Sequence, residues 1–428
     1  MIDSNDILSL LAIPSEDVLT SELIKDTDDH TFVEIELKDN RPNNCPFCFS
    51  EKIVIKDYYN VKINNNIIRK HNLSVNIRMR RYRCKSCSKS FRQSFNLYED
   101  KSHISNRVKD ITRSMLMDFV SMQYIAKEMG VTRQTVINIL DEMPDAQRLK
   151  LPSVLCIDEF HFSNANTKAG KFPSVLSNPF KTEIIDIIES RRKPYLQRYF
   201  SSIPFVERKQ VKYFISDMNE TYRYVHDVFF KDSIYIIDHF HIVKLFTEAI
   251  QTIRVRIMKN YDKNTKAYKF LKKNWKLFLM NRYDLEQLTY VNERTGIVYN
   301  YIDKVDMVLR EYSELAEVYR SKDIFSNKML KLHEYDETKT MVDFFIQNYS
   351  SSNIKELNNI GNTFKNWYYE IINAYSKNSY GIVLSNAIAE SNNNYIQKLI
   401  NIGYGYSNFS RLRKRILYMS SNRKGRED

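Results

Sequence analysis

Two pairs of cysteines constrain the fold of this chain more than any other feature of its 428 residues. Cys45 and Cys48 form one Cys-x-x-Cys pair, and Cys84 and Cys87 form a second. Each spacing lets two thiolates of one tight turn reach the same ion, and four thiolates complete the tetrahedron that structural Zn²⁺ prefers. A redox role would need one such pair in a thioredoxin-like setting, which the basic flanks fit poorly. We therefore predict a zinc ribbon over residues 41–95 with one structural Zn²⁺.

The charge of the chain is divided between neighbouring segments. Residues 1–40 carry eleven acids against two lysines, whereas residues 41–95 carry thirteen Lys and Arg against two acids. Such a basic block is typical of a surface that binds a polyanion, most simply double-stranded DNA. The expected phosphate contacts are Arg78, Arg80, Arg81, Arg83 and Lys85. The alternatives are a solvated basic face and an AT-rich coding sequence, although the latter explains lysines better than arginines.

A helical pair is predicted after the basic segment, within residues 96–150. The stretch SMQYIAKEMGVTRQTVINILDEM has apolar residues at helical spacing on both sides of Gly130, which can supply a turn. Thr132 is placed to cap the second helix. A helix-turn-helix of this kind offers its second helix to a DNA major groove. The residues offered would be Arg133, Gln134 and Asn138. Helical hairpins are common, so the basic neighbour is what favours DNA binding.

From residue 151 onward, strands alternate with helical patches, as in an α/β domain. Candidate strands lie at 153–158, 183–188, 211–216 and 233–237. Two of these apolar strands run into carboxylates, since the first ends at Asp158 and the third is followed by Asp217. A third acid, Glu390, lies in a polar strip of a late helix. Cys156, inside the first strand, is expected to be a small core residue.

Carboxylates at strand ends suit divalent cations, and two such ions can stabilise both the attacking and the leaving oxygen of a phosphoryl transfer. Asp158, Asp217 and Glu390 could thus hold two Mg²⁺ or Mn²⁺. The alternative is three unrelated surface acids, since the chain has 52 acids. Two more acids compete for the role. Strand alternation should turn Glu159 to the opposite face, and Asp238, beside two histidines expected to be packed, is a reserve ligand.

Several stretches make the chain resemble the DDE transposases of bacterial insertion sequences, specifically the ISL-three type. They are IDEFHF around Asp158, ISDMNETY around Asp217, IIDHFHIVKLF from Ile236, LKKNWKLFL near Trp275 and SNAIAESNNNYIQKLINIGYGYSNFSRLRKRIL near the end of the chain. The resemblance implies an α/β core with an RNase H-like mixed sheet and a large all-helical insertion. It also implies that Asp158, Asp217 and Glu390 are the catalytic triad.

Composition and resemblance together predict the order of domains. We expect an acidic leader (1–40), the zinc ribbon (41–95), the helix-turn-helix domain (96–150), the first part of the catalytic core (151–240), the helical insertion (241–380) and the glutamate helix with a basic tail (381–428). With no long apolar run and no basic start typical of a signal peptide, we expect a cytoplasmic, nucleoid-associated bacterial protein without a membrane partner.

The resemblance also implies an activity. A protein of this kind would bind the terminal inverted repeats of its element and catalyse Mg²⁺-dependent cleavage and strand transfer into target DNA. Aligning two DNA ends suggests a homodimer or a larger assembly on DNA. The alternative is a DNA-binding regulator, or a domesticated derivative that has lost catalysis.

Overall fold

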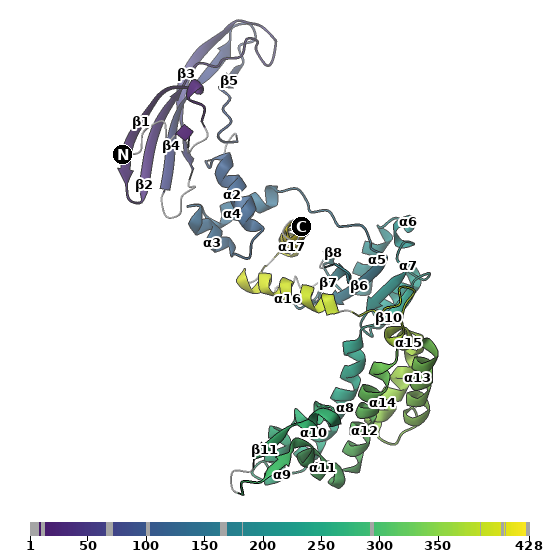
Figure 1. Ribbon diagram of the computed structural model, residues 1–428. Coiled ribbons are helices and arrows are strands. Elements are labelled where there is room, and N and C mark those ends of the chain that lie inside the picture. Colours follow the sequence, from purple (N-terminus) through teal and green to yellow (C-terminus); the bar gives the residue numbers. More distant parts are fainter. Residues whose placement is uncertain are drawn as a thin grey trace. The chain divides into compact units, whose positions relative to one another are not determined.

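The chain divides into two compact units, residues 1–147 with 396–428, and residues 148–395. The computed structural model describes residues 8–9, 13–65, 72–99, 103–162, 169–181, 183–291, 295–385, 387–403, 406 and 408–424 (Figure 1). Each unit buries hydrophobic side chains of its own, so each has its own core.

The first unit begins with a five-stranded sheet. Its strands are β1 (Val18–Thr27), β2 (His30–Leu37), β3 (Ile53–Asn64), β4 (Asn72–Cys84) and β5 (Ser90–Arg92). They run in the order β1-β2-β4-β3, with β5 on β4. β2 pairs with β4 in parallel, and the other pairs are antiparallel. Buried side chains alternate along β2 and along much of β4, which gives this sheet one apolar face.

This sheet unites the acidic and basic segments, which the sequence predicts as two domains that meet at residue 40. The acidic segment supplies β1 and β2, and β2 lies beside the basic strand β4. Glu36 pairs with Arg78 at 3.5 Å and with Arg80 at 3.3 Å across these strands. The acidic segment is therefore part of the folded sheet, and Glu36 neutralises two cations of the neighbouring strand.

Helices complete the first unit. They are α2 (Asn106–Leu116), α3 (Met122–Glu128), α4 (Arg133–Glu142) and α17 (Phe409–Lys424). Thr132 caps α4 as predicted, since its hydroxyl accepts a hydrogen bond from the backbone N–H of Thr135 at 3.1 Å. Gly130 forms the turn before it with a φ of 59°, in the left-handed region that favours glycine. α3 and α4 thus form a helix, a tight turn and a second helix.

The second unit contains a mixed sheet, so the predicted α/β class is confirmed. Its strands are β6 (Val154–Glu159), β7 (Ser174–Asn178), β8 (Glu183–Ile188), β9 (Tyr213–Ser216) and β10 (Ile234–Ile237). They run in the order β10-β9-β6-β7-β8. β6, β7 and β8 are antiparallel neighbours, whereas β9 and β10 run parallel to β6. The helices α5 (Lys193–Ser201), α6 (Phe205–Arg208) and α7 (Glu220–Phe229) connect the strands.

Helices dominate the next stretch, which extends away from the sheet in Figure 1. They are α8 (His239–Lys259), α9 (Lys266–Lys273), α10 (Arg282–Gln287), α11 (Tyr301–Glu311), α12 (Ser313–Asn327), α13 (Tyr335–Tyr349), α14 (Lys355–Asn366) and α15 (Tyr368–Tyr375). Stacked rings such as Phe246 and Phe325, 4.5 Å apart, fill their core.

The insertion is not all-helical, which corrects the prediction. A short antiparallel hairpin, β11 (Thr289–Val291) and β12 (Val298–Asn300), lies between α10 and α11. β-Branched and aromatic residues favour strands, and Tyr290 and Tyr299 stack across the pair with ring centroids 5.8 Å apart.

One helix belongs to both units. α16 (Ala387–Ile402) begins in the second unit and ends in the first, because the boundary falls after residue 395. The sequence predicts that residues 381–428 belong with the catalytic core, whereas the structure groups 396–428 with the N-terminal segments. In the described part of the chain, none of the helices combines the length and the apolar character needed to cross a membrane.

Candidate functional site

Three aspartates lie at the same edge of the second sheet. Asp158 lies near the end of β6, Asp217 directly follows β9, and Asp238 directly follows β10. These three strands are parallel neighbours, and their register sets the three residues at one level. Neighbouring strands are about 4.8 Å apart, so the sheet itself brings these carboxylates together.

Burial makes two of these carboxylates difficult to ionise. Desolvation is the largest cause that raises the pKa of Asp158 from 3.8 to about 6 and that of Asp217 to about 7. The negative charge of Glu159 raises both pKa values further, and Asp158 and Asp217 lie close enough for charge repulsion. A cation at this edge would relieve the cost of ionising both groups. Buried acids with raised pKa values are typical of functional sites.

His241, on the first turn of α8, lies between two of the aspartates. Its Nε2 is 3.7 Å from Oδ2 of Asp217, and its Nδ1 is 3.5 Å from Oδ2 of Asp238. Burial lowers the pKa of His241, but the bond to Asp238 and the charge of Asp217 outweigh that effect and raise it overall. The sequence suggested only a packed histidine here. The only sequence feature that pointed to this cluster was Asp238, which is predicted from the sequence as a reserve metal ligand.

α16 reaches the same edge through Asn393. The side-chain amide of Asn393 donates to Oδ2 of Asp158 at 2.9 Å and to the carbonyl oxygen of Glu159 at 3.3 Å. Glu390 lies three residues earlier on the same helix, so it projects from a neighbouring position one turn away. Its side chain is exposed. The structure thus brings Asp158 and Asp217 to one edge of the sheet, and no contact joins Glu390 to either aspartate.

The donor atoms at this edge suit a hard cation. Oδ1 of Asp217 and Oδ1 of Asn393 are buried and have no hydrogen-bond partner among the described residues. Carboxylate and amide oxygens are the ligands that Mg²⁺ takes from proteins. The carboxylates do not converge on one point, however. Among the described residues, only the four cysteines bring three or more ligand atoms within 4.8 Å of one another.

Glu159 has partners of its own. Arg191 forms an ion pair with Oε1 of Glu159, and the hydroxyl of Tyr222 donates to Oε2 at 2.6 Å. The side chain of Asp158 instead accepts a hydrogen bond from Asn393. The different partners of Asp158 and Glu159 agree with side chains that point alternately to the two faces of β6. Alternation does not isolate Glu159 from the site, since its charge still raises the pKa of Asp217.

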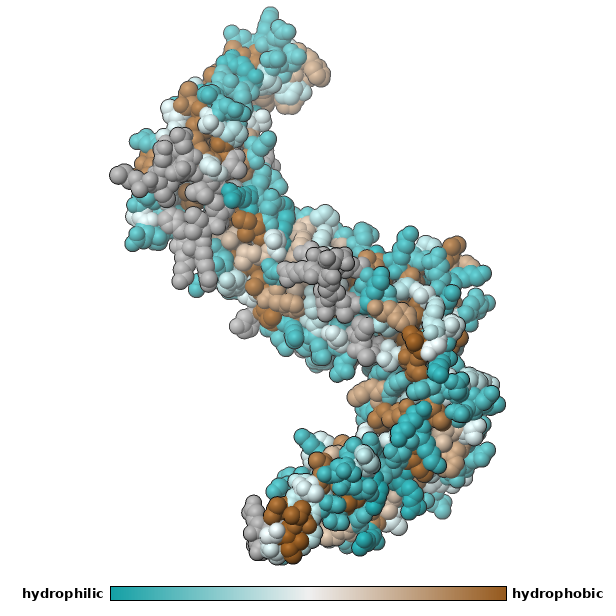
Figure 2. Space-filling view, in the orientation of Figure 1, coloured by the Kyte–Doolittle hydropathy of each residue, from teal (hydrophilic) through white to brown (hydrophobic). Residues whose placement is uncertain are grey.

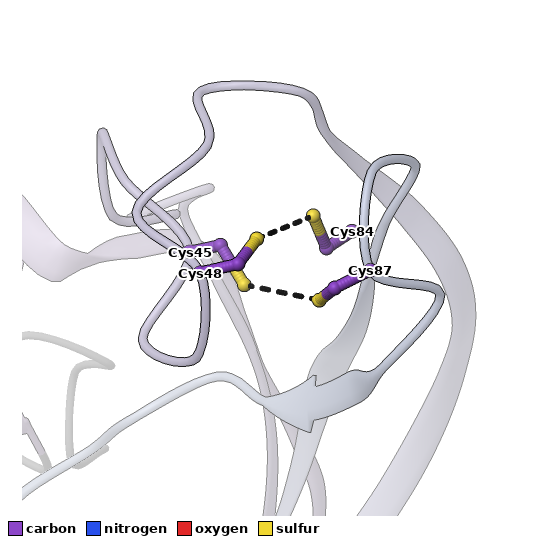
Figure 3. A group of neighbouring side chains, drawn as sticks. All are labelled: Cys45, Cys48, Cys84 and Cys87. Carbon is purple, nitrogen blue, oxygen red and sulfur yellow. Dashed lines mark hydrogen bonds between the residues drawn. The ribbon is translucent and has the colours of Figure 1, made fainter.

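The four thiols could hold a structural zinc ion. The Sγ atoms of Cys45 and Cys87 are 3.8 Å apart, and those of Cys48 and Cys84 are 3.6 Å apart (Figure 3). A tetrahedron with metal–sulfur bonds of about 2.3 Å has sulfur–sulfur separations of about 3.8 Å. The predicted cluster therefore has the right dimensions. Cys156 lies in the other unit, fully buried in its core.

The two cysteine turns have the same backbone form. Phe49 and Ser88, each one residue after the second cysteine of its pair, have φ values of 59° and 58°. Backbone N–H groups of Cys87 and Ser86 donate to the sulfur of Cys84 and, together with the neighbouring thiols, lower its pKa, whereas the same thiols raise the pKa of Cys48. The thiolate that binds metal is thus favoured before any ion arrives.

The predicted phosphate contacts on β4 differ in exposure. Arg83 and Lys85 are exposed beside the cysteine turns. The side chain of Arg78 is 54% exposed, and that of Arg81 is partly exposed and pairs with Asp57 at 3.2 Å. These four cations remain candidates for contact with a polyanion.

Arg80 requires a correction. Its guanidinium donates to the carbonyl oxygen of Leu37 and pairs with Glu36, and only 5% of the residue is exposed. β2 lies beside β4 and covers this side chain. Arg80 therefore stabilises the sheet and is not presented to phosphates.

α4 presents a polar face. Arg133, Gln134 and Asn138 are exposed, and the amide of Gln134 donates to Oδ1 of Asn138 at 2.7 Å. The opposite face is buried through Val136, Ile139 and Leu140. The predicted recognition residues thus share one accessible surface.

A comparison with protein families finds a match. A family model for DDE transposases of the ISL-three type, described as a transposase, matches residues 155–416. The match covers more than half of the chain and includes the three aspartates and α16. No curated protein matches the chain significantly.

Proposed function

The chain belongs to the ISL-three family of DDE transposases, and from that membership we propose that it cleaves DNA at the ends of an insertion sequence and joins them to a target. The observation that carries this proposal is the pair Asp158 and Asp217. Both lie in the matched region, at the ends of parallel strands, with pKa values raised by burial. Glu390, one turn from Asn393 on α16, would be the third carboxylate.

The sheet supports an RNase H-like core. A three-stranded antiparallel meander continues into two strands parallel to its first strand. In this sheet β6 and β9 are parallel neighbours, so their carboxyl ends lie side by side. This topology is what makes two acids, distant in sequence, available to one phosphate.

The metal chemistry would need two Mg²⁺, which supply an activated oxygen nucleophile and stabilise the attacking and leaving oxygens when bound. Asp158 and Asp217 would hold the ions, and the unpartnered Oδ1 of Asp217 is available for that role. Asn393 orients Asp158 through its amide. His241 lies between Asp217 and Asp238 and, when protonated, would lower their repulsion.

The N-terminal modules would select the DNA. Exposed Arg83 and Lys85 suit phosphates, and Arg133, Gln134 and Asn138 on α4 suit base edges in a major groove. The terminal inverted repeats of the element would be the specific site. Two such ends would be paired by at least two copies of the chain.

A second candidate function is a DNA-binding regulator without catalysis. One observation favours it: Glu390 is exposed and contacts neither aspartate. In that case the N-terminal modules would act alone, and the strand-end acids would be a remnant.

The test is cleavage of DNA that carries the element's own terminal repeats, in Mg²⁺. We expect Asp158→Asn, Asp217→Asn and Glu390→Gln each to abolish cleavage and strand transfer while binding to the repeats is retained. Asp232→Asn is the matched control, because Asp232 is an exposed acid at the opposite end of β10. Wild-type cleavage by Glu390→Gln would reject this triad, and repeat binding without cleavage by the wild-type chain would favour the regulator.

A further inference from the structure

The end of the helical insertion carries lysines that the proposed function does not use. We call them the tip lysines: Lys266, Lys269, Lys272 and Lys273 of α9, Lys276 just beyond it, and Lys304 of α11. All are exposed except Lys304, which is half-buried. Within the part of the chain that the structure describes, none of them forms an ion pair with a carboxylate.

The tip lysines of α9 share one side of the helix. Lys266, Lys269 and Lys273 follow a spacing of three and four residues, so they lie along one face. Leu271 is buried on the opposite side. The helix dipole favours cations in the last turn, which accounts for Lys273. It does not account for Lys266 and Lys269, which lie in the first turn and the middle of the helix.

α11 adds a further cation to this surface. Residues of α9 line a groove together with Val308 and Glu311 of α11. Lys304 lies nearer the start of α11. Burial is the main cause that lowers the pKa of Lys304, and the positive charge of Lys273 lowers it further. These two lysines repel each other, and neither forms an ion pair with a carboxylate among the described residues. A bound anion would remove that repulsion.

Aromatic rings lie among the cations. Nζ of Lys304 is 3.4 Å from the ring centroid of Tyr290 and 4.7 Å from that of Tyr301. Nζ of Lys276 is 5.7 Å from the ring of Trp275, of which 39% is exposed. Rings interleaved with cations are typical of surfaces that follow a nucleic-acid backbone.

The adjacent hairpin exposes apolar side chains. Figure 2 shows hydrophobic atoms at this end of the insertion, where Val291, Ile297 and Val298 are more than half exposed. Isolated lysines on a solvated helix need no such neighbours. A mixed surface of this kind indicates a contact with a macromolecule.

We propose that the tip lysines form a second DNA-binding surface, which contacts the phosphate backbone of duplex DNA without reading its sequence. A row of cations on α9 fits a line of regularly spaced phosphates better than one small anion. The inference goes beyond the proposed function, because it assigns DNA contact to a module that contains neither the cysteine cluster nor the strand-end aspartates. It rests on the chain acting on DNA.

The test uses the full-length chain and a random-sequence DNA duplex, with the dissociation constant measured over a range of NaCl concentrations. The variant is the triple change Lys269→Gln, Lys272→Gln and Lys273→Gln, because Gln has a helix propensity close to that of Lys. The matched control is Lys328→Gln, Lys331→Gln and Lys339→Gln, which removes three exposed lysines elsewhere in the insertion. Unchanged Tm and zinc content would show that both triple variants are folded.

We expect the α9 variant to bind more weakly and to lower the slope of log K against log salt by about 1 to 3, since each phosphate contact contributes about 0.9. The control should keep the wild-type slope. Wild-type affinity and slope in the α9 variant would overturn the proposal. So would loss of self-association with DNA binding intact, because the occupant would then be a second copy of the chain.

Failure here is distinguishable from failure of the proposed function. A wild-type chain that cleaves its repeats, with DNA binding indifferent to the tip lysines, would leave the transposase proposal standing and reject this surface. A chain whose DNA binding depends on the tip lysines but which never cleaves would do the opposite.

Discussion

Cys84 is the residue best prepared for its role. Backbone N–H groups of Cys87 and Ser86 lower its pKa, so the thiolate that binds metal is favoured at this position. We expect Cys84→Ser protein to lose zinc or to hold it weakly, as measured by metal analysis after dialysis against a chelator. Cys156→Ala is the control and should keep the wild-type zinc content, because Cys156 lies in the core of the other unit. Full retention of zinc by Cys84→Ser would contradict the four-thiolate site.

Three polar residues of the N-terminal modules should give three different phenotypes. Arg83→Ala should weaken binding to all DNA and lower the salt slope by about 1, because a phosphate contact is lost. Asn138→Ala should weaken binding to the terminal repeats alone by about 1 to 3 kcal/mol, because a base contact is lost. Arg80→Ala should lower Tm instead, because it leaves the carbonyl of Leu37 without its buried donor.

The measurements are DNA binding to repeat and random duplexes, together with thermal unfolding. Equal losses on both duplexes for Arg83→Ala and Asn138→Ala would reject the division between phosphate and base contacts. A normal Tm for Arg80→Ala, with loss of DNA binding, would return Arg80 to the DNA-binding surface.

The sequence was sufficient for part of the site. Asp158 and Asp217 could be found because an apolar run that stops at an acid is a local pattern. Asn393 could not be given its role, because it bonds to Asp158 across 235 residues of sequence. His241 was similarly hidden, since only the parallel pairing of β9 and β10 brings it between two carboxylates.

At the scale of elements, one buried arginine joins α17 to the end of α2 and to the loop between α2 and α3. Arg415 is 1% exposed and donates to the carbonyl oxygens of Leu116, Asp118 and Val120. Its remaining bond goes to the hydroxyl of Tyr406. One side chain of α17 thus donates to three backbone carbonyl groups in and after the last residue of α2.

We expect Arg415→Ala to destabilise the first unit by about 3 kcal/mol, because three carbonyl groups lose a donor at roughly 1 kcal/mol each. Binding to the terminal repeats should fall with it. Arg411→Ala on the same helix is the control and should cost less than about 1 kcal/mol, since its pair with Asp141 is exposed. Thermal unfolding and repeat binding measure both. Equal effects of the two substitutions would show that Arg415 does not hold the helices together.

Elements were predictable where the pattern was continuous. The four predicted strands of the core correspond to β6, β8, β9 and β10. β7 was missed because serines interrupt its apolar run, and one of them, Ser174, is buried through a contact with the hydroxyl of Tyr222 at 3.3 Å. The pairing of β2 with β4 could not be predicted either, because the spacing of residues within each segment does not show which other segment it pairs with.

At the scale of the whole molecule, two cores imply two responses to metals. Mg²⁺ bound to the folded second unit alone should raise its stability by about 2.7 kcal/mol at a hundredfold excess over Kd. A zinc chelator should destabilise the first unit. Calorimetry should therefore show two transitions that move independently, and Asp217→Asn should abolish the shift with Mg²⁺. A single transition that both metals move together would show that the units unfold as one.

Because the first unit combines an early and a late segment of the chain, it cannot be completed until the late segment has been synthesised. α2, α3 and α4 are synthesised before α17, which supplies Arg415 to the end of α2 and the loop before α3, and Lys414 to the end of α4. A chain interrupted before residue 396 would have the cysteine cluster and the strand-end aspartates, yet would lack the helix that holds the DNA-recognition helices in place. Stable DNA recognition would then require synthesis through α17, and products terminated before α17 would compete poorly for the ends of the element.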